Sequence, residues 1–248
     1  MKAIILAAGY ATRLYPLTLN TPKPLLEVGN KKMVEHIISK LEELPELDEI
    51  HIITNDKFYS NFVQWRKGYP STINIFIHND NTKTNEDRLG AMGDVHFLLN
   101  KTKMHDDVVI IGGDNLFDFS LVGMYSLFKA KNAPVVAARD LGDPEKLAKK
   151  FGTIEIDKGH KIISFEEKPE KPKSSLASTC VYMYKKDDMK ELENHVKKAG
   201  IPDNTGDFVK HLMSRKDVYA YPFDETWYDI GSFEQLEEAR KIFGQRKK

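Results

Sequence analysis

Residues 1–26 of the chain read MKAIILAAGYATRLYPLTLNTPKPLL, an aliphatic run followed by a proline-rich segment. The run at residues 2–8 has the composition of a strand that is covered on both faces in a parallel sheet. It ends at Gly9, and the segment after it contains Pro16, Pro22 and Pro24, which forbid a regular helix. We therefore expect a stiff loop at the carboxyl end of a buried strand, where α/β proteins bind their ligands.

The pattern of this first strand returns along the first half of the chain. Short runs rich in Ile and Val occur at residues 49–54, 73–77, 107–111 and 134–138. Apolar side chains at helical spacing occur between these runs, at residues 32–44, 91–99 and 121–130. Strands that alternate with helices predict an α/β fold, in which a three-layer, doubly wound, Rossmann-like sheet is mixed but mostly parallel.

The regular alternation of strand and helix patterns ends after residue 150. Residues 151–157 and 161–167 are typical of a hairpin. Further strands are expected at residues 178–184 and 218–221, and helices at residues 189–198, 207–212 and 233–243. No hexapeptide repeat is visible in the sequence, so we expect one domain over residues 1–248 without a C-terminal β-helix.

The composition limits the classes of function. Lys plus Arg and Asp plus Glu both number 37, which leaves no basic excess for nucleic acid or an anionic membrane. Cys180 is the only cysteine, which excludes an internal disulfide and a zinc site made of several cysteines. The apolar start is too short for a secretory signal, and no apolar run is long enough for a membrane helix. We expect a soluble, cytoplasmic protein with no nucleic acid or membrane as partner, and a homo-oligomer is left open.

Three residues at the start of the chain suggest a phosphate site. Gly9 lets backbone N–H groups approach an anion, and a stiff loop would hold Arg13 and Lys23 over the same anion. The loop lacks the later glycines of a dinucleotide fingerprint and the Gly-Lys-Ser/Thr of a P-loop. Gly9 alone would also suit a tight turn, and the two cations would also suit a solvated surface. Together the three favour a triphosphate or a pyrophosphate.

The same stretch resembles a known family. LAAGYATRLYPLTLNTPKPLLEVGNKKM at residues 6–33 is similar to the pattern LAAGxGTRLxPLTxxxPKPLLPVxxKPM of the sugar-1-phosphate nucleotidylyltransferases, the NDP-sugar pyrophosphorylases. Lys32 replaces a proline of that pattern, and Ala11 replaces its second glycine. Alanine leaves room for a nucleotide but restricts positive φ, so the loop geometry or the base preference could differ from that of relatives.

Three later segments resemble the family in the same order. They are GGDNLF at residues 112–117, FEEKP at 165–169 and WYDIGSFEQL at 227–236. The resemblance implies the nucleotide-diphospho-sugar transferase fold. It also implies a nucleotide-binding core over residues 1–140, and a hairpin-rich part that binds the sugar phosphate and carries the closing helix over residues 141–248.

Two aspartates are candidates for a metal site. Asp114 follows an aliphatic run, where ligands gather, and Asp229 lies between Tyr228 and Ile230 in a segment suited to burial. A buried aspartate needs a partner, and two converging carboxylates would bind Mg²⁺ together with phosphate oxygens and water. Either aspartate would also suit a capped turn.

The remaining roles are those that the resemblance implies. The reaction converts an NTP and a sugar-1-phosphate into an NDP-sugar and pyrophosphate by in-line attack on the α-phosphorus, so positioning and charge neutralisation must supply most of the acceleration. Arg13 and Mg²⁺ are expected on the triphosphate, and Lys23 on the α-phosphoryl group and the leaving pyrophosphate. Nucleotide contacts are expected at Leu6, Ala8, Gly9, Ala11, Thr12, Leu89 and Gly90, and sugar-phosphate contacts at Asn115, Gly152, Glu167 and Lys168.

The sequence leaves open which nucleotide and which acceptor the protein uses. NEDRLGAMGD at residues 85–94 matches the family pattern PLGTAGAL poorly, so Arg88 and Asp94 belong either to base or ribose recognition or to a surface helix. Glucose-1-phosphate with dTTP or UTP is the first choice. A cytidylyltransferase acting on phosphocholine or another non-sugar phosphate, and a non-catalytic module that senses nucleotide sugars, are the alternatives.

Overall fold

The computed structural model describes residues 1–201 and 204–245, and the chain forms two compact units. The first unit comprises residues 1–89, 111–118 and 226–248, and the second comprises residues 90–110 and 119–225. These units are groups of residues that pack against one another. The predicted division at residue 140 separates the residues expected to bind the nucleotide from those expected to bind the sugar phosphate, and it stays a prediction.

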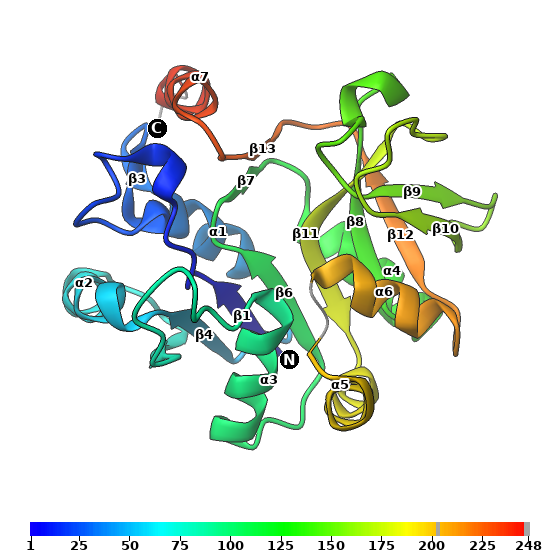
Figure 1. Ribbon diagram of the computed structural model, residues 1–248, viewed down its shortest axis with the longest axis horizontal. Coiled ribbons are helices and arrows are strands. Elements are labelled where there is room, and N and C mark those ends of the chain that lie inside the picture. The colour runs from blue at the N-terminus through cyan, green and yellow to red at the C-terminus, as the bar shows by residue number, and fades with distance from the viewer. Residues whose placement is uncertain (202–203, 246–248) are drawn as a thin grey trace. The chain divides into compact units, whose positions relative to one another are not determined.

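The sheet of the first unit is parallel. Its strands are β1 (Lys2–Leu6) and β4 (Glu49–Thr54), which lie side by side in Figure 1, and β5 (Asn74–Asn79). Ile4 is paired to His51, and His51 is paired to Phe76. Helix α1 (Met33–Leu41) and helix α2 (Asp56–Gly68) belong to the same unit. Because β1 is covered on both faces, Ala3, Ile4 and Ile5 are fully buried.

Two 3₁₀ turns, two pairs of short strands and a helix complete the first unit. They are two 3₁₀ turns (Thr12–Leu14 and Lys23–Leu25), the pair β2 (Glu27–Val28) and β3 (Lys31–Lys32), the antiparallel pair β7 (Asn115–Phe117) and β13 (Trp227–Asp229), and helix α7 (Phe233–Gly244). Leu14, Met33, Leu116, Ile230 and Leu236 pack in one buried cluster, so the first loop, β7 and α7 share a core.

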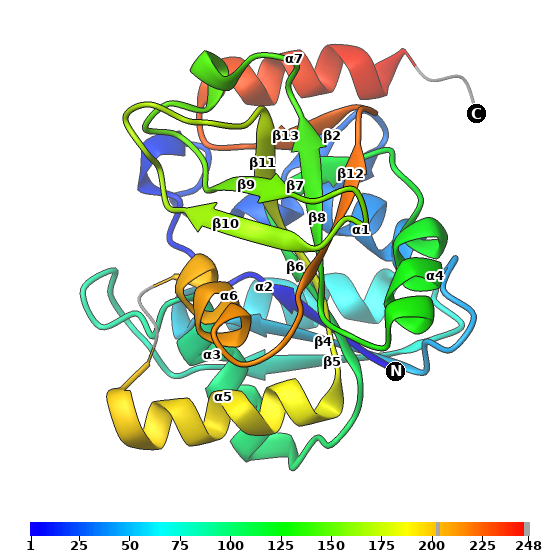
Figure 2. The same ribbon diagram turned by 90° about the vertical axis from the view of Figure 1, so that its right-hand side faces the viewer.

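The second unit is built mainly on antiparallel pairs. Its central strand β11 (Leu176–Tyr184) pairs antiparallel with β8 (Val135–Asp140) and β9 (Thr153–Ile156), and β9 pairs with β10 (Ile162–Glu166). Strand β12 (Tyr219–Phe223) runs parallel to β8, and Figure 2 shows the two side by side. The predicted strand at residues 134–138 thus exists as β8, but its partner β11 runs in the opposite direction.

Helices and the strand β6 account for the rest of the second unit. The helices are α3 (Ala91–Thr102), α4 (Leu121–Lys131), α5 (Lys186–Ala199) and α6 (Thr205–Met213), with a 3₁₀ turn at Pro144–Leu147. Strand β6 (Val108–Gly112) begins in the second unit and ends in the first. Residues 113–118, which follow its carboxyl end, therefore belong to the first unit. Among the described residues, no helix combines the length and the apolar character that crossing a membrane requires.

Helix α2 occupies residues 56–68, for which no helix is predicted from the sequence. Polar residues dominate this segment, yet Phe58, Phe62 and Trp65 recur at helical spacing and are buried. Asn55 provides the start signal, since its side chain accepts a hydrogen bond from Phe58 N at 3.0 Å. The pairs β2–β3 and β7–β13 are also absent from the prediction, because strands of two or three residues carry no periodic pattern.

Candidate functional site

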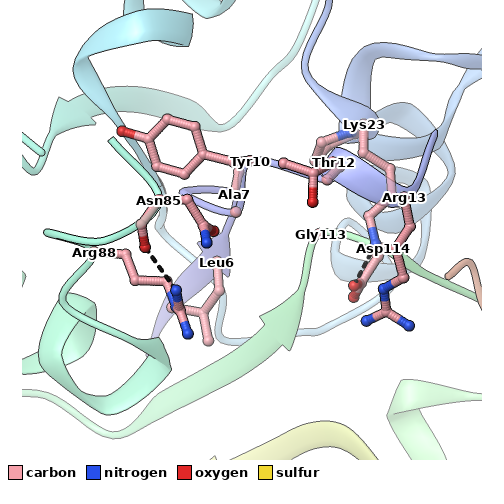
Figure 3. Close-up of a pocket in the computed structure, with 13 residues that line it drawn as sticks. Leu6, Ala7, Tyr10, Thr12, Arg13, Lys23, Asn85, Arg88, Gly113 and Asp114 are labelled. Carbon is pink, nitrogen blue, oxygen red and sulfur yellow. Dashed lines mark hydrogen bonds and ion pairs between the residues drawn. The ribbon is translucent and has the colours of Figure 1, made fainter. Parts of the chain in front are cut away.

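A pocket lies at the carboxyl end of β1, within the first unit. We call it the Gly9 pocket; its volume is about 350 Å³, and it is bounded by the loop after β1, by Lys23, by Asn85 and Arg88, and by Asp114. Figure 3 shows Arg13, Lys23 and Asp114 at one end and Asn85 and Arg88 at the other. The volume is in the range of small-molecule sites, and the position is the one that α/β folds use for ligands.

Gly9 is not required by a tight turn. Its φ lies outside the left-handed region, and a Cβ atom added there would meet no atom within 4 Å. The loop is held instead by Asn55, whose buried side chain donates to Ala8 O at 2.8 Å. The space above Gly9 is therefore left open to the pocket, which favours close approach of a ligand to this backbone.

This geometry predicts the effect of Gly9→Ala. The variant should fold with an unchanged melting temperature, because the methyl group meets open space, while its affinity for a nucleoside triphosphate should fall by about 10-fold or more as the methyl group occupies ligand space. Thermal unfolding and calorimetric titration with the nucleotide measure the two effects. Gly68→Ala is the matched control, since its Cβ also meets nothing within 4 Å but lies at the end of α2. Equal nucleotide affinity in both variants would contradict this role for Gly9.

Ala11 adopts the left-handed conformation, which glycine adopts at the least cost. Its φ is 47° and its ψ is 40°, and Thr18, which is fully buried, donates from Oγ1 to Ala11 O at 2.8 Å. The surrounding contacts thus hold an alanine in a conformation that costs an L-residue energy.

Ala11→Gly is accordingly expected to stabilise the protein. Release of the left-handed strain should exceed the extra entropy of glycine in the unfolded chain and give a gain on the order of 0.5–1 kcal/mol. Ala11→Val should have the opposite effect, because a β-branched residue suits positive φ least. Urea unfolding of the two variants beside the parent measures both. A less stable Ala11→Gly protein would show that the loop is not strained.

Arg13 and Lys23 bring two cations to one end of the Gly9 pocket. The Lys23 side chain is 15% exposed, and its Nζ lies 2.7 Å from Asp114 Oδ2 and 2.7 Å from Ile230 O. Arg13 makes no hydrogen bond or ion pair with any residue that the structure describes, and its Nη1 lies 3.8 Å from the position of a Cβ on Gly231. Lys23 is thus fixed by protein partners, whereas Arg13 is available to an anion.

Asp114 is positioned by a close contact between backbones. Gly113 N donates to Leu6 O at 2.8 Å, and a Cβ on Gly113 would lie 2.8 Å from that oxygen and 2.9 Å from Pro24 Cγ. Only glycine allows this approach. Beyond it, Asn115 is buried, donates from Nδ2 to Asp114 Oδ1 at 3.1 Å and accepts from Trp227 Nε1 at 2.7 Å. Asn115 therefore orients Asp114, and its predicted contact with substrate stays a prediction.

Asp229 comes from the other end of the chain to the same place. In the β7–β13 pair Asp229 is opposite Asn115, and Ile230 N donates to Asp114 O at 3.1 Å. The described residues contain no group of three or more His, Cys, Asp or Glu side chains that could hold a metal ion. Asp114 directly precedes β7 and Asp229 ends β13, and two carboxylates in these positions nevertheless fit Mg²⁺, which takes few protein ligands and prefers oxygens of phosphate and water for the rest.

Three of the predicted sugar-phosphate residues, Gly152, Glu167 and Lys168, lie in the second unit, whereas Asn115 belongs to the first. A Cβ on Gly152 would lie 3.2 Å from Glu167 Oε2, and Lys168 Nζ lies 3.9 Å from Glu167 Oε1. Burial raises the pKa of Glu167. Gly206, at the start of α6, also packs here, since its Cβ would lie 2.8 Å from Glu167 Oε2. The structure brings Gly152, Glu167 and Lys168 together, and their roles toward a sugar phosphate stay predictions.

The other predicted residues are divided between the pocket and its surroundings. Those in its wall are Leu6, Gly9, Ala11, Thr12, Arg13, Lys23 and Asp114. Ala8, Leu89, Gly90, Asn115 and Asp229 are not part of that wall as the described residues form it. Asp94 is buried in the first turn of α3 and not on a helix surface.

Several residues around the pocket are not among the predicted site residues, and three of them are uncharged polar residues. Asn85 and Tyr10 line the pocket, and Asn55 supports it from the start of α2. Asn55 carries a sequence signal, because it follows a strand directly and opens a helix. Asn85 and Tyr10 carry none, since their part depends on how the loop at residues 80–89 returns to the end of β1.

Comparisons with known proteins show the family of the chain. The family model described as "Nucleotidyl transferase" matches residues 2–246. The chain is 32% identical over 242 residues to the bifunctional protein GlmU of Methanocaldococcus jannaschii, covering 97% of this chain and 54% of that protein. It is 33% identical over 239 residues to a Sulfolobus acidocaldarius protein assigned as a mannose-1-phosphate guanyltransferase, covering 93% and 60%. The chain therefore spans a little over half the length of these curated relatives.

A solved structure gives the same result for the fold. A Bacillus anthracis protein assigned as a glucose-1-phosphate thymidylyltransferase, solved with sucrose, superposes with a TM-score of 0.82 at 27% identity, over 100% of this chain and 97% of that one. The predicted fold class is thereby confirmed: a mixed, mostly parallel central sheet with helices, as in the nucleotide-diphospho-sugar transferases. With a family model over nearly all of its length, the chain belongs to the nucleotidyl transferase family.

Proposed function

We propose that this protein transfers a nucleotidyl group from a nucleoside triphosphate to a sugar-1-phosphate, with release of pyrophosphate. The observation that carries the proposal is the ammonium group of Lys23, which is held 2.7 Å from Asp114 in a pocket that also presents the uncommitted guanidinium of Arg13. Such a constellation suits two anionic reactants that must meet. dTTP or UTP with glucose-1-phosphate is the favoured pair, supported by the assigned activity of the Bacillus anthracis protein.

The protein's own groups would each act on a stated atom. Arg13 would bind non-bridging oxygens of the β- and γ-phosphates, and Lys23 would donate to the α-phosphoryl oxygens while charge develops there. Gly9 would let the phosphate or ribose lie against the backbone. Lys168 and Glu167 are assigned, from the resemblance alone, to the phosphate and the hydroxyls of the sugar-1-phosphate. No protein nucleophile or base is needed, because the attacking phosphate oxygen is already ionised.

Asp114 and Asp229 are the residues that would hold Mg²⁺. The bound ion would neutralise charge on the triphosphate and orient the α-phosphate for in-line attack. The protein contributes the two carboxylates, and Asn115 and Gly113 fix the first of them in place.

A matrix of substrates tests the proposal. UTP, dTTP, GTP, CTP and ATP are each combined with glucose-1-phosphate, N-acetylglucosamine-1-phosphate, mannose-1-phosphate and phosphocholine, and pyrophosphate release is measured with and without Mg²⁺. At least one sugar-phosphate pair should release pyrophosphate only in the presence of the metal. Turnover of phosphocholine alone would establish the cytidylyltransferase alternative. Nucleotide-sugar binding without any turnover would establish a sensing module instead.

A further inference from the structure

The end of the Gly9 pocket opposite Lys23 carries a second arginine. Arg88 and Asn85 lie there, away from Arg13, Lys23 and Asp114 (Figure 3). A nucleotide whose phosphates occupy the cationic end must extend its base toward the other end, since the ribose separates the two. This step rests on the proposed function. Arg88 then faces the base of the nucleotide, whose identity the sequence motifs leave open.

The loop that carries Arg88 is organised by its own side chains. Asp87 accepts hydrogen bonds from Lys83 N at 3.0 Å and from Thr84 N at 2.9 Å, and these bonds hold the pKa of its carboxyl below the usual range. Arg88 Nη1 in turn donates to Asn85 O at 2.6 Å. The loop thus fixes one nitrogen of the guanidinium and leaves the others as donors.

No carboxylate neutralises Arg88. The neighbouring Asp87 is committed to backbone N–H groups, and none of the residues that the structure describes forms an ion pair with the guanidinium. A guanidinium has donors only, and Arg88 is exposed, so its remaining N–H groups are open to solvent and can donate to acceptor atoms of a ligand. An arginine held in this way in a pocket can recognise hydrogen-bond acceptors on a ligand.

We infer that Arg88 selects a nucleotide whose base carries a ring carbonyl oxygen, and so discriminates against ATP. Guanine, cytosine, uracil and thymine all present at least one carbonyl oxygen as an acceptor, whereas adenine presents an amino group beside its ring nitrogens. Adenine has no carbonyl oxygen: a guanidinium beside its amino group places donor against donor, and a ring nitrogen accepts through one lone pair where a carbonyl oxygen offers two. The inference narrows the proposed substrate to the keto-base nucleotides, which include the favoured dTTP and UTP.

The test compares Arg88→Gln with the parent across the five nucleoside triphosphates. Both kcat/KM with a turned-over sugar phosphate and the dissociation constant of each nucleotide alone are measured. The preference of the parent for the best keto-base nucleotide over ATP should fall by about 10- to 100-fold in the variant, as loss of one good base contact predicts. Lys83→Gln is the control: it removes a cation from the same loop at a position outside the pocket wall and should leave the preference unchanged.

Inhibition by inorganic pyrophosphate distinguishes a contact with the base from a contact with the phosphates, because pyrophosphate has no base. Its inhibition constant should be the same in Arg88→Gln and in the parent. An equal loss of affinity for all five nucleotides and for pyrophosphate would instead make Arg88 a phosphate ligand and overturn the inference, as would an unchanged preference over ATP. If no pair of substrates is turned over, the proposed function fails, while a keto-base preference in binding that Arg88→Gln abolishes still supports the inference.

Discussion

Lys23→Met is expected to reduce kcat/KM by about 10²- to 10³-fold, as removal of a single preorganised donor to a developing charge typically does. Methionine preserves the length and apolar stem of lysine and deletes the charge. The loss should appear mainly in kcat, because Lys23 is expected to interact most strongly when the α-phosphorus carries its extra negative charge. Steady-state kinetics with the substrate pair identified in the matrix measures the effect.

Structural damage must be separated from this catalytic loss. Lys23 also donates to the carbonyl of the buried Ile230, so its removal takes one partner from that carbonyl and one from Asp114. The melting temperature of Lys23→Met therefore needs to be measured, and the kinetics recorded well below it. Lys31→Met is the matched control, because Lys31 is exposed on β3 and its side chain, within the described part of the chain, bonds to Ser39 alone. Near-parental turnover by a folded Lys23→Met protein would remove Lys23 from the reaction.

Asp114→Asn and Asp229→Asn are expected to lose turnover on the order of 10³-fold, since neutralising one of two carboxylates around a catalytic ion removes several kcal/mol of charge stabilisation. Asparagine retains the shape of aspartate, so the β7–β13 pair should persist. The amount of Mg²⁺ required for half-maximal activity should rise in both variants. Titrating activity against Mg²⁺ at saturating substrates measures this shift.

The double variant provides the decisive comparison. If both carboxylates hold the same ion, the second substitution should add little to the loss caused by the first, because groups that act as a unit are strongly non-additive. Asp48→Asn is the control, a partly exposed carboxylate that pairs with Lys2 elsewhere in the first unit. Normal turnover by the double variant would end the assignment of a metal to these residues.

Much of the fold follows from local sequence patterns. The strand at residues 49–54 was predicted with its observed bounds, and the helix starting at residue 91 was predicted from its first residue. Both are regular elements whose apolar side chains repeat at a fixed period, so the signal is contained in a few adjacent residues. Helix α2 shows the limit, since aromatic residues on one face were outnumbered by polar residues on the others.

The candidate site was predictable only in part. Gly9, Arg13, Lys23 and Asp114 occur in recognisable motifs, and the structure places all four around one pocket. Arg88 could not be placed, because its neighbours match no motif and its position depends on where an irregular loop returns. Hydrogen bonds such as that of Asn55 to Ala8, across 47 residues, leave no trace in local sequence.

The β7–β13 pair links residues 115–117 to residues 227–229, and this makes the order of synthesis important. A ribosome that has delivered Lys23 and Asp114 must add more than a hundred further residues before Asp229 exists, a delay of about 6–23 seconds at ordinary translation rates. During that interval the nascent chain has an unpaired β7 and one carboxylate of its acidic pair. Chains that terminate early should therefore hold a nucleotide at most, and should not consume it.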